Sequence, residues 1–422
     1  MKRLKYVLAV LIFGCSVILT ACGKEGKSVE PEQGDGNRSE LTEEEMKGGH
    51  ASFQMAENLV VDADVTAKEK YEKGLSSYYL KIFCETDKES EKKFLEAPTL
   101  SLHSFEEWKE MLNKIVPGKF QNDEFKLNKS DADILQTYKG EDGTAYFFQV
   151  NWSNHKKGVV EKTGFNSPII TVSRNEGNDL SNRAKDIRQY VQNYNGSGKD
   201  GFLQDAEEKA DRMKEFLQEM TERPVYGKYD YVIVNNENVA LMNQAQPWMN
   251  RKEPEEEYAV LYFYYDIDGL PFKELRLNYF MENDDTANEL CYWGSLEGKR
   301  LTAISEHEQE LIISRDGIIS LECSNLRYPG EIYKEKLPIV SPNEALKQVK
   351  EFYDRQLITE ECVVTDIELV YTGYFSDGAD GEIQPVIAPF WEIKVYDNSV
   401  GSYTHFTYDA CTGECVREGA QQ

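Results

Sequence analysis

The feature that most constrains the fold is a series of short apolar segments that end at tight-turn residues. Leu311–Ser314 is followed by Arg315-Asp316-Gly317 and then by Ile318–Cys323. An Asp-Gly pair between two apolar segments is a strong hairpin signal, because the favoured short turns need positive φ angles. Tyr258–Tyr265 shows the same pattern: the turn sequence IDGLP follows it, and we expect Glu274–Phe280 to pair back. These segments predict antiparallel sheets.

Other segments have the alternation or the composition of β-strands. In the segment FWEIKVY, Trp391, Ile393 and Val395 occupy one face. Glu392 and Lys394 occupy the other face, which is typical of a half-buried antiparallel strand. The remaining predicted strands are Asn58–Val65, Ala145–Trp152, Pro168–Val172, Tyr229–Val234, Val363–Tyr371 and the hairpin Tyr403–Val416, which turns at Thr412-Gly413.

Two segments have the periodicity of helices. From Leu203 to Met220, apolar residues recur at spacings of three and four, which places them on one helix face. The second helix begins at Ser341, with Pro342 at its first position and Glu344 placed to complete a capping box. Its expected apolar face consists of Ala345, Leu346, Val349, Phe352 and Tyr353.

The order helix, strand, strand, strand occurs twice, at 203–280 and at 342–416. Helices that lie between runs of strands indicate an α+β fold with antiparallel sheets and packed helices, rather than a doubly wound fold. The repeated order further predicts a duplicated helix-plus-three-strand unit.

The N-terminus has the pattern of an export signal. Basic residues in MKRLK precede an apolar run at 6–18, which is shorter than the roughly 20 residues that a membrane-spanning helix needs. The run leads to Leu19-Thr20-Ala21-Cys22, which resembles the bacterial lipoprotein box. The resemblance implies cleavage after Ala21 and a diacylglyceryl group on the thiol of Cys22. The alternative is an ordinary signal peptide that happens to end in cysteine.

Residues 23–49 have the composition of a tether. They are rich in Glu, Gly, Lys and Ser and nearly free of large apolar residues, so they cannot bury enough surface to offset the entropy of ordering. The predicted organisation is therefore a signal peptide at 1–21, a disordered tether at 22–50, a β-rich α+β domain at 51–200, a central α+β unit at 201–337 and a C-terminal α+β unit at 338–422.

The charge of the chain restricts its partners. Its 422 residues include 75 acidic and 48 basic side chains, which give a formal charge of −27. Such a surface repels phosphate backbones and anionic lipid, so nucleic-acid binding and adsorption of the folded body to a membrane are not expected. The charge is consistent with solubility outside the cell or with attraction to cations or to a basic partner.

Six cysteines remain beside Cys22 and the leader residue Cys15. An exported protein can form disulfides, but a chain with a large core does not need them, and sequence leaves the pairing open. We expect buried free thiols, with the close pair in YDACTGEC as the alternative site of a disulfide. The six are Cys84, Cys291, Cys323, Cys362, Cys411 and Cys415.

The C-terminal residues carry a family resemblance. The helix start SPNEAL at 341–346, the strand IELVY at 367–371, PFWEI at 389–393 and the final YDA and TGE are similar to PepSY-like and YycI-like extracytoplasmic domains. Cys411 and Cys415 are additions to that pattern. The whole layout resembles uncharacterised surface lipoproteins of Gram-positive bacteria. The resemblance covers the last 110 or so residues well, and it implies a non-catalytic sensing, inhibitory or regulatory module without any active-site residue.

Motifs for chemistry are weak throughout the chain. His307-Glu308-Gln309-Glu310 has Leu311 where a zinc protease motif needs a second histidine. Asp266-x-Asp268-Gly269 lacks the first and last ligands of an EF-hand, which favours a turn between strands. Gly196-Ser197-Gly198 is not a nucleophile elbow. His50, His103, His155 and His405 are isolated in sequence and show no sign of a catalytic triad.

These observations favour a lipid-anchored surface protein that binds or regulates an envelope protein or peptide and carries no catalytic, cofactor-binding or metal-binding residues. Lipidation at Cys22 is then its one assigned site. A surface hydrolase of wall glycan or peptide is the alternative, because a pair of catalytic carboxylates among 75 acidic residues cannot be recognised from spacing in sequence.

Overall fold

The computed structural model places most of the chain that follows the tether. The described residues are 38–66, 68–82, 105–120, 127–128, 133–141, 143–151, 169–174, 177–192, 202–221, 225–273, 291–296, 299–304, 309–323, 327–356, 360–377 and 383–418. All of them belong to one unit, Asn37–Gln422. In the stretches that are described, no helix combines the length and apolar character needed to cross a membrane.

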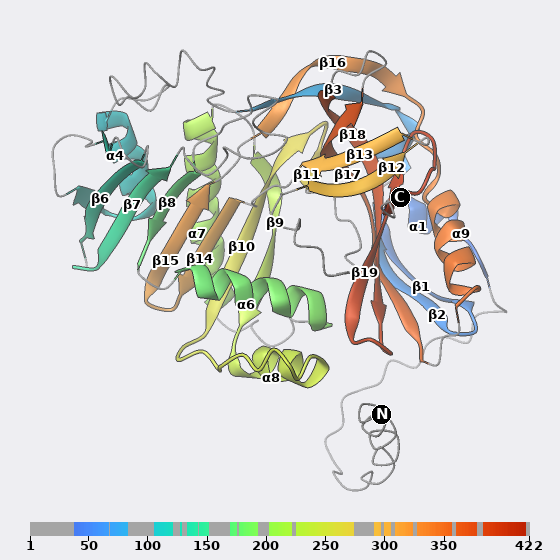
Figure 1. The fold of residues 1–422 in the computed structure, drawn as a ribbon, viewed down its shortest axis with the longest axis horizontal. Helices are drawn as coiled ribbons and strands as arrows, with labels where there is room; N and C mark the ends of the chain where they lie inside the picture. Colours follow the sequence, from blue (N-terminus) through green and yellow to red (C-terminus); the bar gives the residue numbers. More distant parts are fainter. Residues whose placement is uncertain are drawn as a thin grey trace, which may run out of the picture. The chain divides into compact units, whose positions relative to one another are not determined.

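One group of strands pairs in antiparallel fashion on the left of Figure 1. In spatial order its strands are β6 (Asp133–Gly140), β7 (Ala145–Asn151), β8 (Ile169–Ser173), β15 (Gly317–Cys323), β14 (Gln309–Ser314), β10 (Tyr258–Ile267) and β9 (Val225–Val234). Two short strands also pair with β6, namely β4 (Gly118–Phe120) and β5 (Leu127–Asn128).

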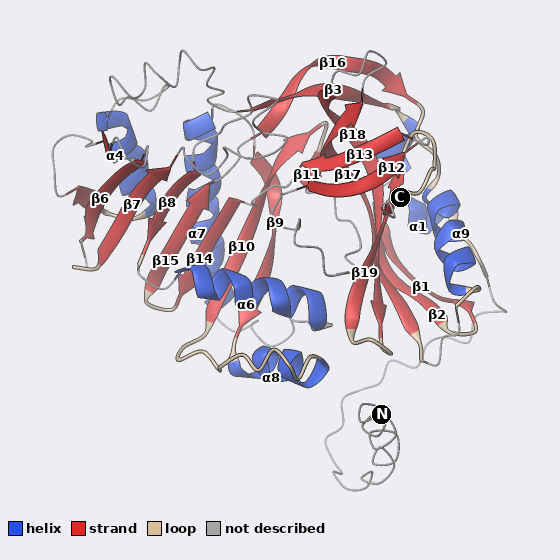
Figure 2. Cartoon of the chain, viewed as in Figure 1, coloured by secondary structure: helices blue, strands red, loops and turns tan. Residues whose placement is uncertain are grey.

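Helices cover both faces of this arrangement (Figure 2). The odd-numbered side chains of β10, such as Leu261, pack in one core with Met213 and Leu217. Its even-numbered side chains, such as Val260, pack in a second core with Met242. The strand is therefore buried on both faces, as its apolar run requires. The helices on the first face are α4 (Phe105–Ile115) and α7 (Phe202–Thr221), and those on the second are α6 (Gly177–Tyr190) and α8 (Asn236–Ala245).

A second group of strands is built around two long strands. In spatial order they are β1 (Gly49–Ala56), β2 (Leu59–Val65), β17 (Cys362–Asp377), β18 (Ile383–Asp397) and β19 (Ser402–Asp409). The β2–β17 pair is parallel and the other pairs are antiparallel. Helix α9 (Pro342–Tyr353) covers one face, where Ala345, Leu346 and Val349 are fully buried.

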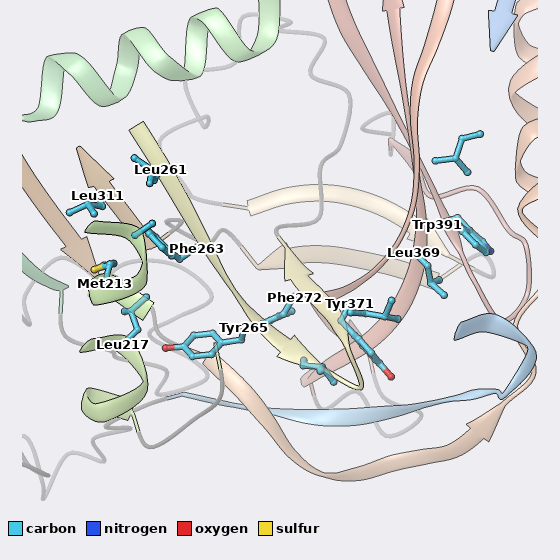
Figure 3. Close-up of a cluster of buried hydrophobic side chains, with 14 of the residues drawn as sticks. Met213, Leu217, Leu261, Phe263, Tyr265, Phe272, Leu311, Leu369, Tyr371 and Trp391 are labelled. Carbon is cyan, nitrogen blue, oxygen red and sulfur yellow. The ribbon is translucent and has the colours of Figure 1, made fainter. Parts of the chain in front are cut away.

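The β10–β11 hairpin connects the two groups. Strand β11 (Leu270–Lys273) turns back from β10 and then runs parallel to β17, with Phe272 beside Tyr371. One continuous core therefore extends from Met213 to Trp391 (Figure 3). The remaining elements are α1 (Glu43–Met46), α2 (Lys68–Glu72), β3 (Leu75–Ile82), β12 (Cys291–Leu296), β13 (Lys299–Ile304), β16 (Arg327–Leu337) and β20 (Arg417–Glu418).

The predicted α+β class with antiparallel sheets and packed helices is confirmed. Strand pairs also cross the predicted boundaries, because β2 lies beside β17 and β3 beside both β16 and β18. Segments that are far apart in the chain therefore share one sheet. The hairpins predicted at Asp316-Gly317 and at Thr412-Gly413 are present, and Gly413 has the expected positive φ of 75°.

Several local predictions need correction. The tract predicted as a disordered tether contains α1, because Thr42 and Glu45 form a capping box and Leu41 is buried. Strand β10 pairs back with β11, and the predicted partner Glu274–Phe280 lies outside the described residues. Two smaller corrections concern α9: the Ser341 hydroxyl accepts from the amide of Asn343 instead of Glu344, and the side chain of Phe352 is 44% exposed.

Candidate functional site

The face of β17–β18–β19 that points away from α9 carries charged side chains. Glu368 on β17 lies directly opposite Glu392 on β18. Their side chains are only 33% and 13% exposed. Two like charges at opposed strand positions destabilise a sheet, so both carboxylates need cations nearby. We call the charged side chains around them the polar cluster: Arg188, Asp230, Lys273, Glu368, Glu392 and His405.

Strand β11 supplies the cation for Glu368. Lys273 Nζ lies 2.7 Å from Glu368 Oε2 and 3.7 Å from Asp230 Oδ2, and its side chain is 12% exposed. The ammonium also lies 5.0 Å from the centre of the Tyr264 ring. Burial lowers the pKa of Lys273, but the carboxylates of Asp230 and Glu368 outweigh it and hold the pKa well above its usual value. Lys273 is therefore cationic at neutral pH.

Helix α6 brings a second cation to the same cluster. Arg188 Nη2 donates to Asp230 Oδ2 at 3.1 Å and to Tyr264 Oη at 3.0 Å. Tyr264 Oη in turn donates to Asp230 Oδ2 at 3.1 Å. The arginine is 8% exposed. These bonds join α6, β9 and β10, and Lys273 extends them to β17.

The third pair of the cluster lies between β18 and β19. His405 Nδ1 lies 2.9 Å from Glu392 Oε1, and both side chains are at most 15% exposed. Beside them, Lys394 Nζ lies 3.7 Å from Asp366 and 4.2 Å from the centre of the Tyr403 ring. Each carboxylate of the polar cluster thus has a basic side chain within 4 Å.

The pKa of the Glu368 carboxyl is raised above its usual value. Burial raises its pKa, the Lys273 ammonium opposes that effect, and the charges of Asp230 and Glu392 raise the pKa further. A carboxyl with a raised pKa opposite a second carboxylate is an arrangement that acid–base enzymes use, and structural ion networks produce it too. The cluster can hold or exchange a proton at Glu368.

Two of the histidines that looked isolated in sequence have carboxylate partners. His405 belongs to the polar cluster, as described above. His50 lies 2.8 Å from Asp62 and 3.3 Å from Asp64 on the exposed β1–β2 hairpin, and the hydrogen bond to Asp62 raises its pKa. Period-two alternation places Asp62 and Asp64 on one face of β2. Their contact with His50 could have been inferred only if the register of β1 on β2 were known. His103, His155 and His307 lie outside the described residues.

None of the described cysteines takes part in a disulfide. Cys323 and Cys362 are buried, and Cys411 and Cys415 are partly buried without a disulfide between them. Burial raises the pKa of Cys362 and of Cys411 to about 12, so these thiols stay protonated and unreactive. The predicted buried free thiols are confirmed at Cys323 and Cys362. The lipidation site and two other thiols lie outside the described side chains: Cys22, Cys84 and Cys291.

The segment that resembled part of an EF-hand is a turn, as predicted, and it has a structural role that the sequence did not reveal. Asp266 Oδ1 accepts from Gly269 N at 2.6 Å, which closes the β10–β11 turn. Asp268 Oδ2 accepts from Tyr78 Oη at 2.7 Å and from Tyr371 Oη at 3.0 Å. Burial and this carboxylate raise the pKa of Tyr78 to about 12. The turn is thereby fastened to β3 and β17.

Metal-ligating groupings were sought among the side chains that the structure describes. No set of three or more His, Cys, Asp or Glu side chains there is placed to hold a metal ion. The three acids of the polar cluster are instead interleaved with Arg188, Lys273 and His405. Cation binding at this cluster would first have to displace those basic groups.

Comparison with known proteins assigns the chain to no family. No protein-family model matches the chain, and no curated protein matches it. A crystal structure of an uncharacterised protein from Eubacterium rectale resembles it with a TM-score of 0.48 and 16% sequence identity, over 89% of this chain and 97% of that one.

Proposed function

We propose that the chain is a lipid-anchored extracytoplasmic module that binds or regulates an envelope protein or peptide without catalysing a reaction. The observation that carries this proposal is the pairing within the polar cluster. Lys273, Arg188 and His405 each lie within 3.1 Å of a carboxylate. The acids thereby join α6 and β11 to β9, β11 to β17, and β18 to β19, which is a bracing role rather than that of a poised acid or nucleophile.

The proposed location rests on the Leu19-Thr20-Ala21-Cys22 box. A diacylglyceryl group supplies two acyl chains, and two chains suffice for stable anchoring. Cys22→Ala should leave the precursor without lipid and release the protein from the membrane fraction. Palmitate labelling that persists in Cys22→Ala would contradict the lipoprotein assignment, while Cys15→Ala serves as the control that should remain labelled.

The proposed family is the PepSY-like group of extracytoplasmic domains. Helix α9 followed by the antiparallel strands β17, β18 and β19 supports this proposal for the C-terminal unit. We also propose that the chain contains a duplicated unit, with α7, β9 and β10 as the second copy of that order. Helix α8 is inserted between β9 and β10 in this copy, so the proposal rests on the order of the other elements.

A direct test compares binding with turnover. The chain from Gly23 onward would be used in pull-downs from envelope extract and in assays of peptidoglycan and peptide hydrolysis. We expect reproducible capture of an envelope component and no turnover. Turnover that is lost on changing one acid or histidine, in a variant that still unfolds cooperatively, would replace the binding function with an enzymatic one.

The surface hydrolase of wall glycan or peptide is the second candidate, because one observation favours it. Glu368 lies opposite Glu392 and has a raised pKa, as the acid partner of a carboxylate pair requires. Glu368→Gln and Glu392→Gln are the informative variants. A hydrolase should lose most of its turnover in each of them, whereas a binding module should keep its partner in both.

A further inference from the structure

One tryptophan is exposed to an extent that the fold does not require. The side chain of Trp248 is 76% exposed, whereas that of Trp391 is fully buried. Trp248 follows the C-terminal end of α8. A large exposed aromatic is informative because tryptophan is enriched at the centres of protein interfaces, where it contributes much of the binding energy.

The loop that carries Trp248 is held in place on both sides. The side chain of Asn243 on α8 exchanges two hydrogen bonds of 2.8 Å with the backbone of Arg251. The Arg251 guanidinium lies 2.8 Å from Asp186 on α6. Met249 packs against the core beneath α8, so Trp248 points outward from a braced loop. A loop that is already held in this way loses little backbone entropy when a partner binds.

Two more exposed apolar side chains lie around the same helix. Leu241 on α8 is 44% exposed, and Val400 in the β18–β19 turn is 58% exposed. The turn lies against α8, because Gln246 Nε2 donates to Val400 O at 3.4 Å. A β-carbon built on Gly401 would lie 3.4 Å from Ala245 Cβ. We call Leu241, Trp248 and Val400 the α8 patch.

Exposed charges near the α8 patch are mostly acidic. On α8, Glu237 precedes Leu241 by one helical turn. The segment after Trp248 exposes Lys252 and the acids Glu253, Glu255 and Glu256. Glu360 and Glu361 are also exposed, and the Glu361 carbonyl accepts from Asn398 in the β18–β19 turn at 2.6 Å. The formal charge of the chain, −27, has the same sign.

We propose that the α8 patch binds a basic segment of a partner protein, with an apolar side chain of that segment on Leu241 and Val400 and a Lys or Arg on the ring of Trp248. This inference rests on the proposed binding function and names its surface and the chemistry of its partner. The acidic rim complements a cationic segment and opposes an anionic lipid surface. A cation over the face of a tryptophan ring adds to the attraction.

The test uses the unit Asn37–Gln422, which contains the whole described core, and two synthetic probes. One is a short peptide of alternating Lys and Leu, and the other has Glu in place of each Lys. We expect saturable binding of the Lys peptide with a shift in tryptophan emission, weaker binding at high salt, and no binding of the Glu peptide. Trp248→Ala should weaken the binding about tenfold or more, as for a central aromatic of an interface.

The matched control is Ile332→Ala, which removes a side chain that is 50% exposed on β16, away from α8. It should bind the Lys peptide as the unchanged chain does. Three results would overturn the proposal: equal affinity of Trp248→Ala, equal binding of both peptides, or Trp248-dependent binding to neutral lipid vesicles in place of the peptide. Dimerisation that Trp248→Ala abolishes would overturn it in favour of a second copy of the chain.

The failure of this inference can be told from failure of the proposed function. If Trp248→Ala captures the same envelope component as the unchanged chain, the partner binds elsewhere; the binding function then stands and the α8 patch is excluded. If the chain hydrolyses wall material and that activity depends on Glu368, the proposed function itself is wrong, whatever the peptides do.

Discussion

The two faces of the β17–β18–β19 strands differ in how they are stabilised. On the face under α9, Trp391, Ile393 and Val395 are completely buried in the apolar core. On the opposite face, Glu368 and Glu392 are balanced by Lys273 and His405. The first face depends on shape and area, and the second on charge matching between distant segments. Substitutions should therefore affect the two faces by different mechanisms.

The largest effect is expected on the apolar face. Trp391 is fully buried, its Nε1 donates to Val340 O at 3.0 Å, and its ring packs edge-on against Tyr71. Trp391→Ala should lower the free energy of unfolding by about 3–5 kcal/mol, because the cavity cannot fully collapse and the Val340 carbonyl loses its donor. Denaturant unfolding measures this change.

Trp248→Ala is the matched control for that substitution, because it removes the same side chain from a position that is 76% exposed. Its effect should stay within about 0.5 kcal/mol. A loss for Trp391→Ala as small as that of the control would mean that the α9 face can repack without its largest side chain.

The next effect concerns the polar face. Lys273→Ala removes the ammonium that lies 2.7 Å from Glu368 and leaves two opposed glutamates without it. Breaking a buried pair from one side typically costs 3–5 kcal/mol. We expect about 3 kcal/mol, because Glu368 keeps 33% of its side chain exposed and water screens the charge that remains.

A double-mutant cycle sharpens this prediction. In Lys273→Ala/Glu368→Gln, the uncompensated charge is gone, so the combined loss should be smaller than the sum of the two single losses. If the loss in the double variant equals the sum of the losses in Lys273→Ala and Glu368→Gln, the 2.7 Å contact does not couple the two residues.

A smaller effect is expected at the last turn, where the apolar face ends. Gly413 has a φ of 75°, and its amide donates to Asp409 O at 2.8 Å. Residues with a β-carbon pay about 1–2 kcal/mol in this region of φ. The free space is adequate, since the added β-carbon would lie 3.7 Å from Val340. Backbone strain is therefore the expected cost of Gly413→Val.

Thermal unfolding should show a melting temperature that is a few degrees lower for Gly413→Val, roughly 2–4 °C for each kcal/mol in a chain of this size. Gly49→Val is the control, because no atom lies within 4 Å of its added β-carbon and its φ is not positive. Equal melting temperatures for the two variants would contradict the strain argument.

The contrast between the faces also explains which parts of the structure can be predicted from the sequence. Period-two alternation placed Trp391, Ile393 and Val395 on one face, and the spacing of Ala345, Leu346 and Val349 predicted the helix face that covers them. Short-range signals of this kind depend only on neighbours in the chain. The turns at Gly317 and Gly413 were predictable for the same reason.

The polar cluster could not be predicted in this way. Its members come from α6, β9, β11, β17, β18 and β19, and Lys273 meets Glu368 because β11 pairs in parallel with β17. Lys273 and Glu368 are 95 positions apart. No spacing in sequence encodes that contact. Helix α8 was missed as well: Asn235 caps it by accepting from the amide of Asn238, but ten residues are too few to show a clear apolar period.

The smallest predicted effect is a pH dependence that separates two glutamates. The pKa of Glu368 is raised, chiefly by burial. The folded chain therefore keeps the proton of Glu368 at pH values where the unfolded chain, with a pKa of about 4.3, has already released it. Its contribution to stability is therefore complete below that pH and is lost as pH rises through the higher folded pKa. Glu368→Gln should remove this loss, so its unfolding free energy should fall less with rising pH over that window.

Glu45 provides the opposite case on the other face of the same sheet. Burial raises its pKa, but the Thr42 amide and the Arg38 guanidinium outweigh burial and lower it overall. Its contribution is present above the unfolded pKa and is lost as pH falls through the folded value, so Glu45→Gln should weaken the stability loss on the acid side.

Denaturant unfolding between about pH 3 and pH 7 would compare both variants with the unchanged chain, at slopes of at most about 1.4 kcal/mol per pH unit. If the curve of Glu368→Gln runs parallel to that of the unchanged chain, Glu368 ionises in the folded state as it does in water, and the polar face then holds a fixed negative charge opposite Glu392.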